Sequence, residues 1–475
     1  MNTYRSLNSI KNAIKVGETT CHSLIQSYIK NIEDNKSLNA FIEVFDEEAL
    51  QTAKQIDTKI GKGIAGKLAG MAIGIKDNIC YKNHRSGAAS KVLEEFESLY
   101  SATVIDRLLA EDAIIIGRLN CDEFAMGSAN ENSVYGPCKN PIDNTKVSGG
   151  SSGGAATAVA ANLCLAALGS DTGGSIRQPA SFCGNVGLKP TYSRVSRFGL
   201  IAFASSFDQI GPITNTVEDA AIILEVIAGG DDFDSTVSTK KVEEYSQILD
   251  DKKTLKRIAY FPEYLENEGL ETDVKSAIEN QIQQLKNNGH LVEEVSFPYL
   301  DYLVPTYYII STAEASSNLA RFDGVHYGFR SADANSPETT YSKTRTQGFG
   351  EEVKRRIMLG TFVLSAGYHD AYYTKAQKMR RLIQNKTNEI LKEYDFILSP
   401  TTPHSAFELG QKMKNPIAMY LEDIYTVLAN LSGNPAISLP IAKDQEGMPF
   451  GIQLMSKPFH EAELLAFSHN LINSL

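Results

Sequence analysis

Two glycine-rich segments carry serines in a pattern suited to nucleophilic catalysis. One runs from Ser148 to Gly154 and contains Ser151, and the other runs from Gly169 to Arg177 and contains Ser175. Flanking glycines let the backbone adopt conformations closed to other residues, which brings N–H groups close to a small reacting centre. Such an oxyanion hole is worth about 3 to 4 kcal/mol per donor in a transition state. The predicted donors are the backbone amides of Thr172, Gly173, Gly174 and Ser175.

A serine hydroxyl needs a base near neutral pH, and the sequence offers a lysine. Lys76 ends the apolar run Met71 to Ile75 and precedes Asp77, so we expect it at the end of a buried strand. Burial disfavours the ammonium form and lowers the pKa of a lysine. Taken alone, however, a lysine at a strand end is also typical of a surface side chain whose charged end reaches solvent.

Two other interpretations of the serine segments stay open. Gly149 to Gly153 matches G-x-S-x-G, the nucleophile elbow of hydrolases with a Ser–His–acid triad. That arrangement needs a strand directly before it, whereas Asn140 to Lys146 is a loop containing Asn and Pro, and His404 would have to serve as the histidine. Alternatively, both segments are structural turns.

Two further motif matches are judged accidental. Gly61 to Leu68 comes close to a phosphate-binding loop, but Leu68 stands where a Ser or Thr must hold Mg²⁺, and the segment follows a helix. We therefore expect a turn there. Ser27 to Lys30 matches S-x-x-K without the companion motifs of that enzyme class, and we expect an amphipathic helix surface.

The six cysteines and eight histidines lack the spacings of metal ligands, so we expect no metal site and reduced, buried thiols. A net charge of −11 argues against a broad basic face that binds nucleic acid unaided. The longest apolar stretches, such as Ala155 to Leu168, fall short of the roughly 20 residues of a membrane span, and no secretory pattern is present. A cytoplasmic protein without membrane contact is expected.

Hydrophobic patterns predict a single α/β domain of 475 residues. A helical N-terminal lobe is expected over about 1–60, with an exposed face suited to docking another chain. The core, over about 68–230, alternates helices with short apolar strands such as Ala113 to Ile116. The range of about 231–300 predicts a peripheral strand–helix–strand unit. The remainder is largely helical to Leu391, and late strands are expected at 396–398, 437–441 and 450–454.

Gly74 to Asn78, Gly149 to Gly154 and Gly169 to Ala180 together resemble the amidase signature family in order and spacing. The resemblance implies an α/β fold, with a large mixed β-sheet covered on both faces by α-helices. It also implies a catalytic triad and a cis peptide bond directly before Ser151. That triad consists of Ser175 as nucleophile, Ser151 as proton relay and uncharged Lys76 as general base.

Further stretches resemble the glutamine-cleaving members of that family, namely 122–128, 321–324, 352–360 and 420–425. Free glutamine is zwitterionic, so its pocket needs a cation for the α-carboxylate and an anion for the α-ammonium. The resemblance assigns Arg356 to the carboxylate and Asp423 to the ammonium. Further contacts are Tyr307 and Ser128, while Tyr308 and Arg355 are alternatives in the adjacent register. Cys121 and His404 are residue types that the family pattern does not require.

The function that the resemblance implies is cleavage of glutamine through a γ-glutamyl ester, with release of ammonia. The ammonia would pass to a partner B subunit, which uses ATP and Mg²⁺ to convert Glu-tRNA(Gln), or Asp-tRNA(Asn), into the amidated form. A small C subunit would brace the heterotrimer, and tRNA would contact mainly the B subunit. This chain itself would bind no cofactor. The alternatives are a free-standing amidase of small amides and a catalytically silent scaffold.

Overall fold

One mixed β-sheet organises the chain. The computed structural model describes residues 4–249, 254–411 and 415–473. Within them the sheet has 11 strands in the order β1-β3-β2-β4-β6-β5-β10-β11-β9-β7-β8. Strand β2 is parallel to β3 and β4, β7 is parallel to β8 and β9, and the other pairs are antiparallel. The strands are β1 (Phe41–Val44), β2 (Ala72–Lys76), β3 (Ile114–Leu119), β4 (Ala166–Asp171), β5 (Val186–Lys189), β6 (Gln209–Thr214), β7 (Arg257–Tyr260), β8 (Leu291–Glu294), β9 (Phe396–Pro400), β10 (Ala436–Lys443) and β11 (Pro449–Ser456).

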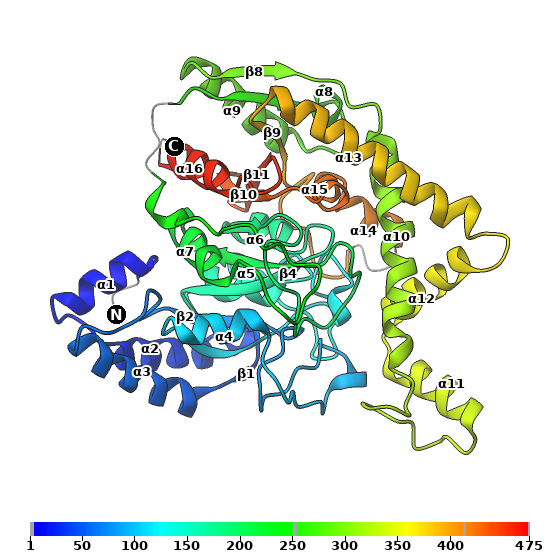
Figure 1. The fold of residues 1–475 in the computed structure, drawn as a ribbon, viewed down its shortest axis with the longest axis horizontal. Coiled ribbons are helices and arrows are strands. Elements are labelled where there is room, and N and C mark those ends of the chain that lie inside the picture. The colour runs from blue at the N-terminus through cyan, green and yellow to red at the C-terminus, as the bar shows by residue number, and fades with distance from the viewer. Residues whose placement is uncertain (1–3, 250–253, 412–414, 474–475) are drawn as a thin grey trace.

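Helices cover both faces of this sheet (Figure 1). Helices α5 and α6 pack on each other and on the central strands, and so do α7 and α16. The predicted α/β fold is therefore confirmed. The helices are α1 (Leu7–Lys15), α2 (Cys21–Asp34), α3 (Asp46–Gly61), α4 (Thr103–Ala110), α5 (Gly153–Ala160), α6 (Arg177–Cys183), α7 (Val217–Ile227), α8 (Pro262–Leu265), α9 (Thr272–Asn287), α10 (Leu303–Asn318), α11 (Pro337–Gly348), α12 (Glu351–Leu364), α13 (Lys375–Glu393), α14 (Pro416–Leu421), α15 (Val427–Ser432) and α16 (Glu461–Ile472).

Strands β2 and β3 lie side by side in the sheet, and every residue in both is buried. Strands buried on both faces read as continuous apolar runs rather than as alternating patterns. This is why their sequences predicted strands, although the observed β3 begins one residue later and ends three residues later than the predicted Ala113 to Ile116.

The N-terminal lobe departs from the helical prediction at β1, which lies between α2 and α3. All four residues of β1 are half-buried, so its sequence carries no alternation that marks a strand. Antiparallel pairing with β3 holds it in the sheet. Gly117 of β3 permits this close approach, because a Cβ there would lie 2.4 Å from the Glu43 carbonyl oxygen.

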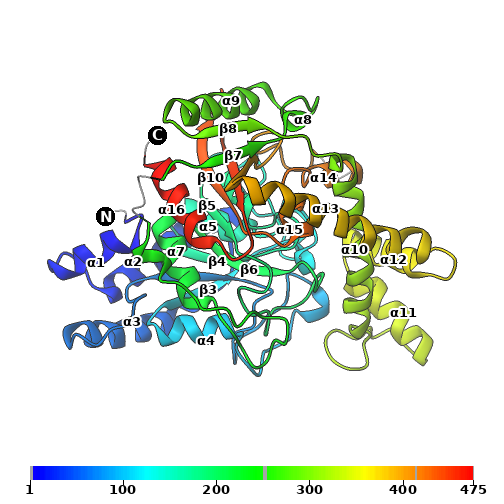
Figure 2. The same ribbon diagram turned by 45° about the horizontal axis from the view of Figure 1, so that its top comes forward.

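The predicted strand–helix–strand unit after residue 230 is present as β7, α9 and β8. Strand β7 pairs in parallel with β9, so this unit extends the main sheet at its edge (Figure 2).

The two accidental motif matches have the local structures expected for them. The Gly61 to Leu68 segment forms turns after α3, and Lys30 lies exposed on α2, where it pairs with Asp34.

Helices α10, α11, α12 and α13 project from one side of the molecule (Figure 1). Helix α12 packs closely against α10, because a Cβ at Gly360 would lie 1.9 Å from the carbonyl oxygen of Thr312. In the described ranges, none of the helices combines the length and apolar character needed to cross a membrane.

The α10–α12 contact predicts the effect of adding one methyl group. Gly360→Ala should lower the free energy of unfolding by about 1 to 3 kcal/mol, because overpacking outweighs the better helix propensity of alanine. The midpoint of urea denaturation measures this change. Gly61→Ala is the matched control, since Gly61 also belongs to a helix but a Cβ there meets nothing within 4 Å. Equal effects of the two substitutions would contradict the close packing of α12.

Candidate active site

Lys76 lies at the end of β2 with no solvent exposure. Its Nζ is 2.7 Å from the Ser151 Oγ, 2.9 Å from the Ser152 Oγ and 3.0 Å from the Ser170 Oγ. Burial lowers the pKa of Lys76 to about 8, although nearby acidic groups such as Asp122 oppose the shift. The amine is therefore buried and surrounded by hydroxyls, as a lysine base requires, and is not a surface side chain.

Ser151 sits in a turn that the Asp122 backbone N–H and the Gln178 side-chain amide hold in place. The peptide bond between Gly150 and Ser151 is cis, as predicted. The Gly150 N–H donates to the Gln178 side chain at 2.9 Å, and the Ser151 carbonyl accepts from the Asp122 N–H at 3.1 Å. A Cβ at Gly150 would lie 2.2 Å from the Asp122 carboxylate, so only glycine fits.

Ser175 lies in the second turn, between β4 and α6, and is 8 % exposed. Its carbonyl accepts from the Ser152 N–H at 3.2 Å, so this hydrogen bond joins the two glycine segments. Gly174 has a φ of +136°, and a Cβ there would collide with the Thr426 hydroxyl at 2.3 Å. Both constraints explain why the turn needs glycine.

The Asp171 carboxylate, at the end of β4, organises the Ser175 turn from within. It accepts from the Gly174 N–H at 2.9 Å and from the Ile176 N–H at 3.2 Å. One of the four predicted oxyanion donors, Gly174, is thus already hydrogen bonded. The structure leaves the amides of Thr172, Gly173 and Ser175 as the candidates from that prediction.

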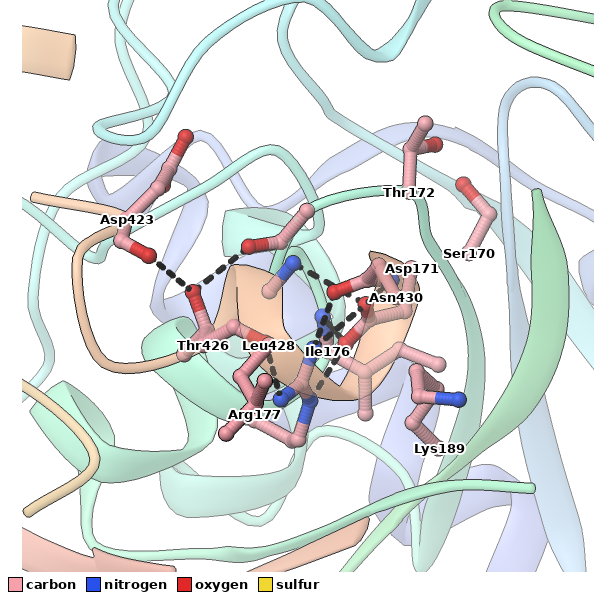
Figure 3. A network of polar contacts seen from close by, with 12 residues as sticks. Ser170, Asp171, Thr172, Ile176, Arg177, Lys189, Asp423, Thr426, Leu428 and Asn430 are labelled. Atoms are coloured by element: carbon pink, nitrogen blue, oxygen red, sulfur yellow. Dashed lines mark hydrogen bonds and ion pairs between the residues drawn. The ribbon is translucent and has the colours of Figure 1, made fainter. Parts of the chain in front are cut away.

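Asp171 in turn belongs to a fully buried ion pair with Arg177 (Figure 3). Two guanidinium nitrogens lie 2.9 and 3.0 Å from its oxygens, and Asn430 adds a hydrogen bond of 2.9 Å. Burial alone would raise the pKa of Asp171, but the Arg177 guanidinium outweighs it and holds the pKa at about 2. The carboxylate therefore stays charged, and it anchors the turn rather than transferring protons.

The residues assigned to a glutamine pocket come together around Asp423. Its carboxylate accepts from the Ser128 hydroxyl at 2.9 Å and from the Tyr308 hydroxyl at 2.7 Å. Tyr308, the adjacent alternative, thus contacts Asp423. Tyr307 points at the catalytic turn instead, because a Cβ at Gly173 would lie 2.5 Å from its hydroxyl oxygen. Burial raises the pKa of Asp423 to about 7, against the opposing effect of these hydroxyls and of Arg356.

Arg356, on α12, is the buried member of the Arg355–Arg356 pair, with 2 % exposure. Its Nε donates to Glu352 at 2.8 Å, and its guanidinium lies 5.3 Å from the ring centre of Tyr308. Arg355 is 45 % exposed and pairs with the other oxygen of Glu352. The helix therefore directs Arg356, and not Arg355, toward the aromatic cluster beside Asp423.

Thr426 connects the pocket to the catalytic turn. Its hydroxyl donates to the Gly173 carbonyl at 2.5 Å and lies 3.1 Å from the Asp423 carbonyl. Thr426, Ser170 and Gln178 had no role assigned from the sequence. Ser170 and Gln178 lie inside the matched segments, which was the available signal, whereas Thr426 follows directly after the recognised range 420–425.

The competing triad would have needed His404. Its Nε2 lies 3.0 Å from the Glu422 carboxylate and its Nδ1 contacts the Ser405 carbonyl. Ser151, by contrast, is paired with Lys76. Cys121 is buried beside that lysine, and burial raises the pKa of its thiol, which keeps it neutral. All six cysteines are buried and free.

A buried lysine that contacts one serine turn, joined by a hydrogen bond to a second serine turn, is an arrangement suited to amide cleavage. The family model of the amidases matches residues 23–465, and the chain belongs to this amidase family. It is 49 % identical to the A subunit of the glutamyl-tRNA(Gln) amidotransferase of Chlorobaculum parvum, over 98 % of both chains. It is 50 % identical to the protein of the same name from Koribacter versatilis, over 99 % of this chain and 98 % of the relative.

A solved structure shows the same similarity. The crystal structure of the A subunit of glutamyl-tRNA(Gln) amidotransferase from Thermotoga maritima has 41 % sequence identity and a TM-score of 0.76. That similarity covers 94 % of this chain and 90 % of the other. The relatives thus share nearly the whole length of the fold described above.

The state of Lys76 predicts how activity depends on pH. Only the neutral amine accepts a proton, so kcat/KM for amide cleavage should rise as the pH increases through about 8, the pKa of Lys76. Initial rates measured across this range test the prediction. Lys76→Ala should remove the activity at every pH. A rate that falls through this range, or activity retained without Lys76, would show that another group is the base.

Proposed function

We propose that this chain is the glutamine-cleaving subunit of a tRNA-dependent amidotransferase. The single observation that carries the proposal is the buried pairing of Lys76 with Ser151, next to a pocket that holds Arg356 and Asp423. The relatives, named as A subunits of glutamyl-tRNA(Gln) amidotransferases, support it over nearly the full chain. They favour this function over that of a free-standing amidase.

The proposed chemistry begins with a neutral Lys76. Two of its hydrogens stay donated to Ser152 and Ser170, so the lone pair of the amine faces Ser151. Ser151 passes a proton to Lys76 and accepts one from Ser175. The Ser175 oxygen then attacks the γ-carboxamide carbon of glutamine, and the negative charge that develops on the carbonyl oxygen is held by the backbone amides of the turn.

Collapse of this intermediate breaks the C–N bond. The proton returns through Ser151 to the leaving nitrogen, which departs as ammonia and leaves a γ-glutamyl ester on Ser175. Water then attacks the ester by the same proton route and releases glutamate. The reaction consumes one glutamine and one water and yields one glutamate and one ammonia.

The pocket supplies selectivity for a free amino acid in this proposal. Arg356 has its Nε engaged with Glu352, which directs its two terminal nitrogens to the α-carboxylate of glutamine. Asp423, in reach of Ser128 and Tyr308, receives the α-ammonium. Binding this cation favours the charged carboxylate over the protonated form that burial promotes.

The ammonia would be used by a partner. We propose that B and C subunits complete a heterotrimer in the cytoplasm, and that the B subunit binds tRNA, ATP and Mg²⁺. It would convert Glu-tRNA(Gln), or Asp-tRNA(Asn), to the amidated product. The relatives carry the word subunit in their names, which supports a complex of several chains.

The test is a glutaminase assay with the wild-type chain and Ser175→Ala. The wild type, with the chains that co-purify with it, should release ammonia from glutamine and form Gln-tRNA(Gln) from Glu-tRNA(Gln) and ATP. Ser175→Ala should lose both activities, because no other hydroxyl occupies the nucleophile position, and added ammonium should restore amidation. Glutamine turnover by Ser175→Ala would contradict the mechanism, and a wild type inert toward a serine-directed reagent would indicate a silent scaffold.

Selectivity for glutamine gives a second prediction. Arg356→Ala should lower kcat/KM for glutamine by about 10- to 150-fold, the value of one charge-assisted contact. Hydrolysis of a small aryl amide, which has no α-carboxylate, should change little. Arg355→Ala is the control, because that neighbour is exposed. An equal loss on both substrates would favour a free-standing amidase.

A further inference from the structure

Glu123 is a buried carboxylate that belongs neither to the catalytic triad nor to the pocket. It lies in a short 3₁₀ turn, Glu123–Ala125, and is 4 % exposed. One oxygen accepts from the Ser90 hydroxyl, and the other accepts from the Gly350 N–H at 2.8 Å. Burying a carboxylate is costly unless hydrogen bonds satisfy it, so a specific role for these two contacts is expected.

The contact with Gly350 fixes the beginning of α12. Gly350 is the N-cap of this helix, where unpaired N–H groups and the helix dipole favour a negative charge. The two groups also touch sterically, since a Cβ at Gly350 would lie 2.5 Å from the Glu123 carboxylate. Helix α12 carries Glu352 and Arg356, so its N-terminal position sets where the guanidinium lies.

Asp122, the residue before Glu123, contacts the turn that carries Ser151. The Asp122 N–H donates to the Ser151 carbonyl, and the Asp122 carboxylate accepts from the N–H groups of Asn130 and Asn132 at 2.9 and 3.1 Å. The two neighbouring residues therefore make contacts in two directions, Asp122 through its backbone N–H and Glu123 through its carboxylate. Asp122 supports the turn of Ser151, and Glu123 supports the helix that begins after Gly350.

We propose that Glu123 is a positioning residue that fixes α12, and with it Arg356, at the correct distance from the Ser151 turn. The inference rests on the proposed function, because it assigns Arg356 to the α-carboxylate of glutamine. Glu123 itself touches no substrate. Its loss lets the first turn of α12 shift, which weakens glutamine binding and leaves the triad assembled.

The test compares Glu123→Ala with a variant that keeps one acceptor, Glu123→Gln, in the full chain and its co-purifying subunits. Glu123→Ala should raise KM for glutamine about 10-fold or more, with kcat reduced less than about 3-fold, because the helix but not the reacting atoms moves. Glu123→Gln should raise KM less than about 3-fold, since its amide oxygen still accepts from Gly350.

A second measurement separates positioning from general damage. A small sulfonyl fluoride has neither α-carboxylate nor α-ammonium, so its rate of labelling of Ser175 should stay within about 2-fold in both variants. Asp219→Ala is the matched control. Asp219, on α7, is also buried. Its carboxylate accepts at 3.0 Å from the N–H of Leu7, which begins α1 in the N-terminal lobe. This control should leave KM for glutamine unchanged.

The possible outcomes separate the role of Glu123 from the proposed function of the chain. An unchanged KM in Glu123→Ala, or labelling of Ser175 that falls as far as glutamine cleavage does, would overturn the role of Glu123. An equal KM increase in Asp219→Ala would do the same, because any lost buried carboxylate would then suffice. A wild type that is labelled at Ser175 but does not cleave glutamine would contradict the proposed function instead. If Glu123→Ala fails to fold, Glu123→Met, which has a similar size but accepts no hydrogen bond from the Gly350 N–H, takes its place and should raise KM for glutamine in the same way.

Discussion

The proposed chemistry depends on keeping one lysine amine out of water. Burial lowers the pKa of Lys76 to about 8. Relative to a solvated lysine, that shift corresponds to a cost on the order of 3 kcal/mol for the charged form. The fold supplies this free energy by placing Lys76 at the end of β2, a strand buried on both faces, and by offering hydroxyls from Ser151, Ser152 and Ser170 as partners.

A buried aspartate contacts each serine turn. The backbone N–H of Asp122 donates to the Ser151 carbonyl, whereas the Asp171 carboxylate accepts from N–H groups of the Ser175 turn. Short glycine turns have few side-chain contacts of their own, so hydrogen bonds from backbone N–H groups to a fixed anion are an effective way to hold them. Arg177 balances the charge of Asp171, because an unpaired buried carboxylate would protonate or destabilise the fold.

The pocket around Asp423 and the turn that carries Ser175 are linked by contacts to their backbone carbonyls. Thr426 hydrogen bonds to the carbonyl of Gly173 in the catalytic turn and lies against the carbonyl of Asp423 in the pocket. The dipeptide Asp122-Glu123 makes a similar connection from the other side, between the Ser151 turn and α12. In the proposed mechanism, a substrate held by the pocket is therefore positioned by the same segments that hold the reacting groups.

The sequence by itself determined which segments form the candidate site, because Lys76, Ser151 and Ser175 lie in short motifs of fixed order, and the proposed roles of these residues follow from that order. Continuous apolar runs likewise marked β2 and β3. Only the tertiary structure decided which of two neighbours faces inward, as for Arg356 over Arg355, since a helix rotates by about 100° per residue and a small shift of register exchanges them. It also decided that β1 is a strand and that Glu123 reaches Gly350, 227 residues away, because such contacts exist only once distant segments pack together.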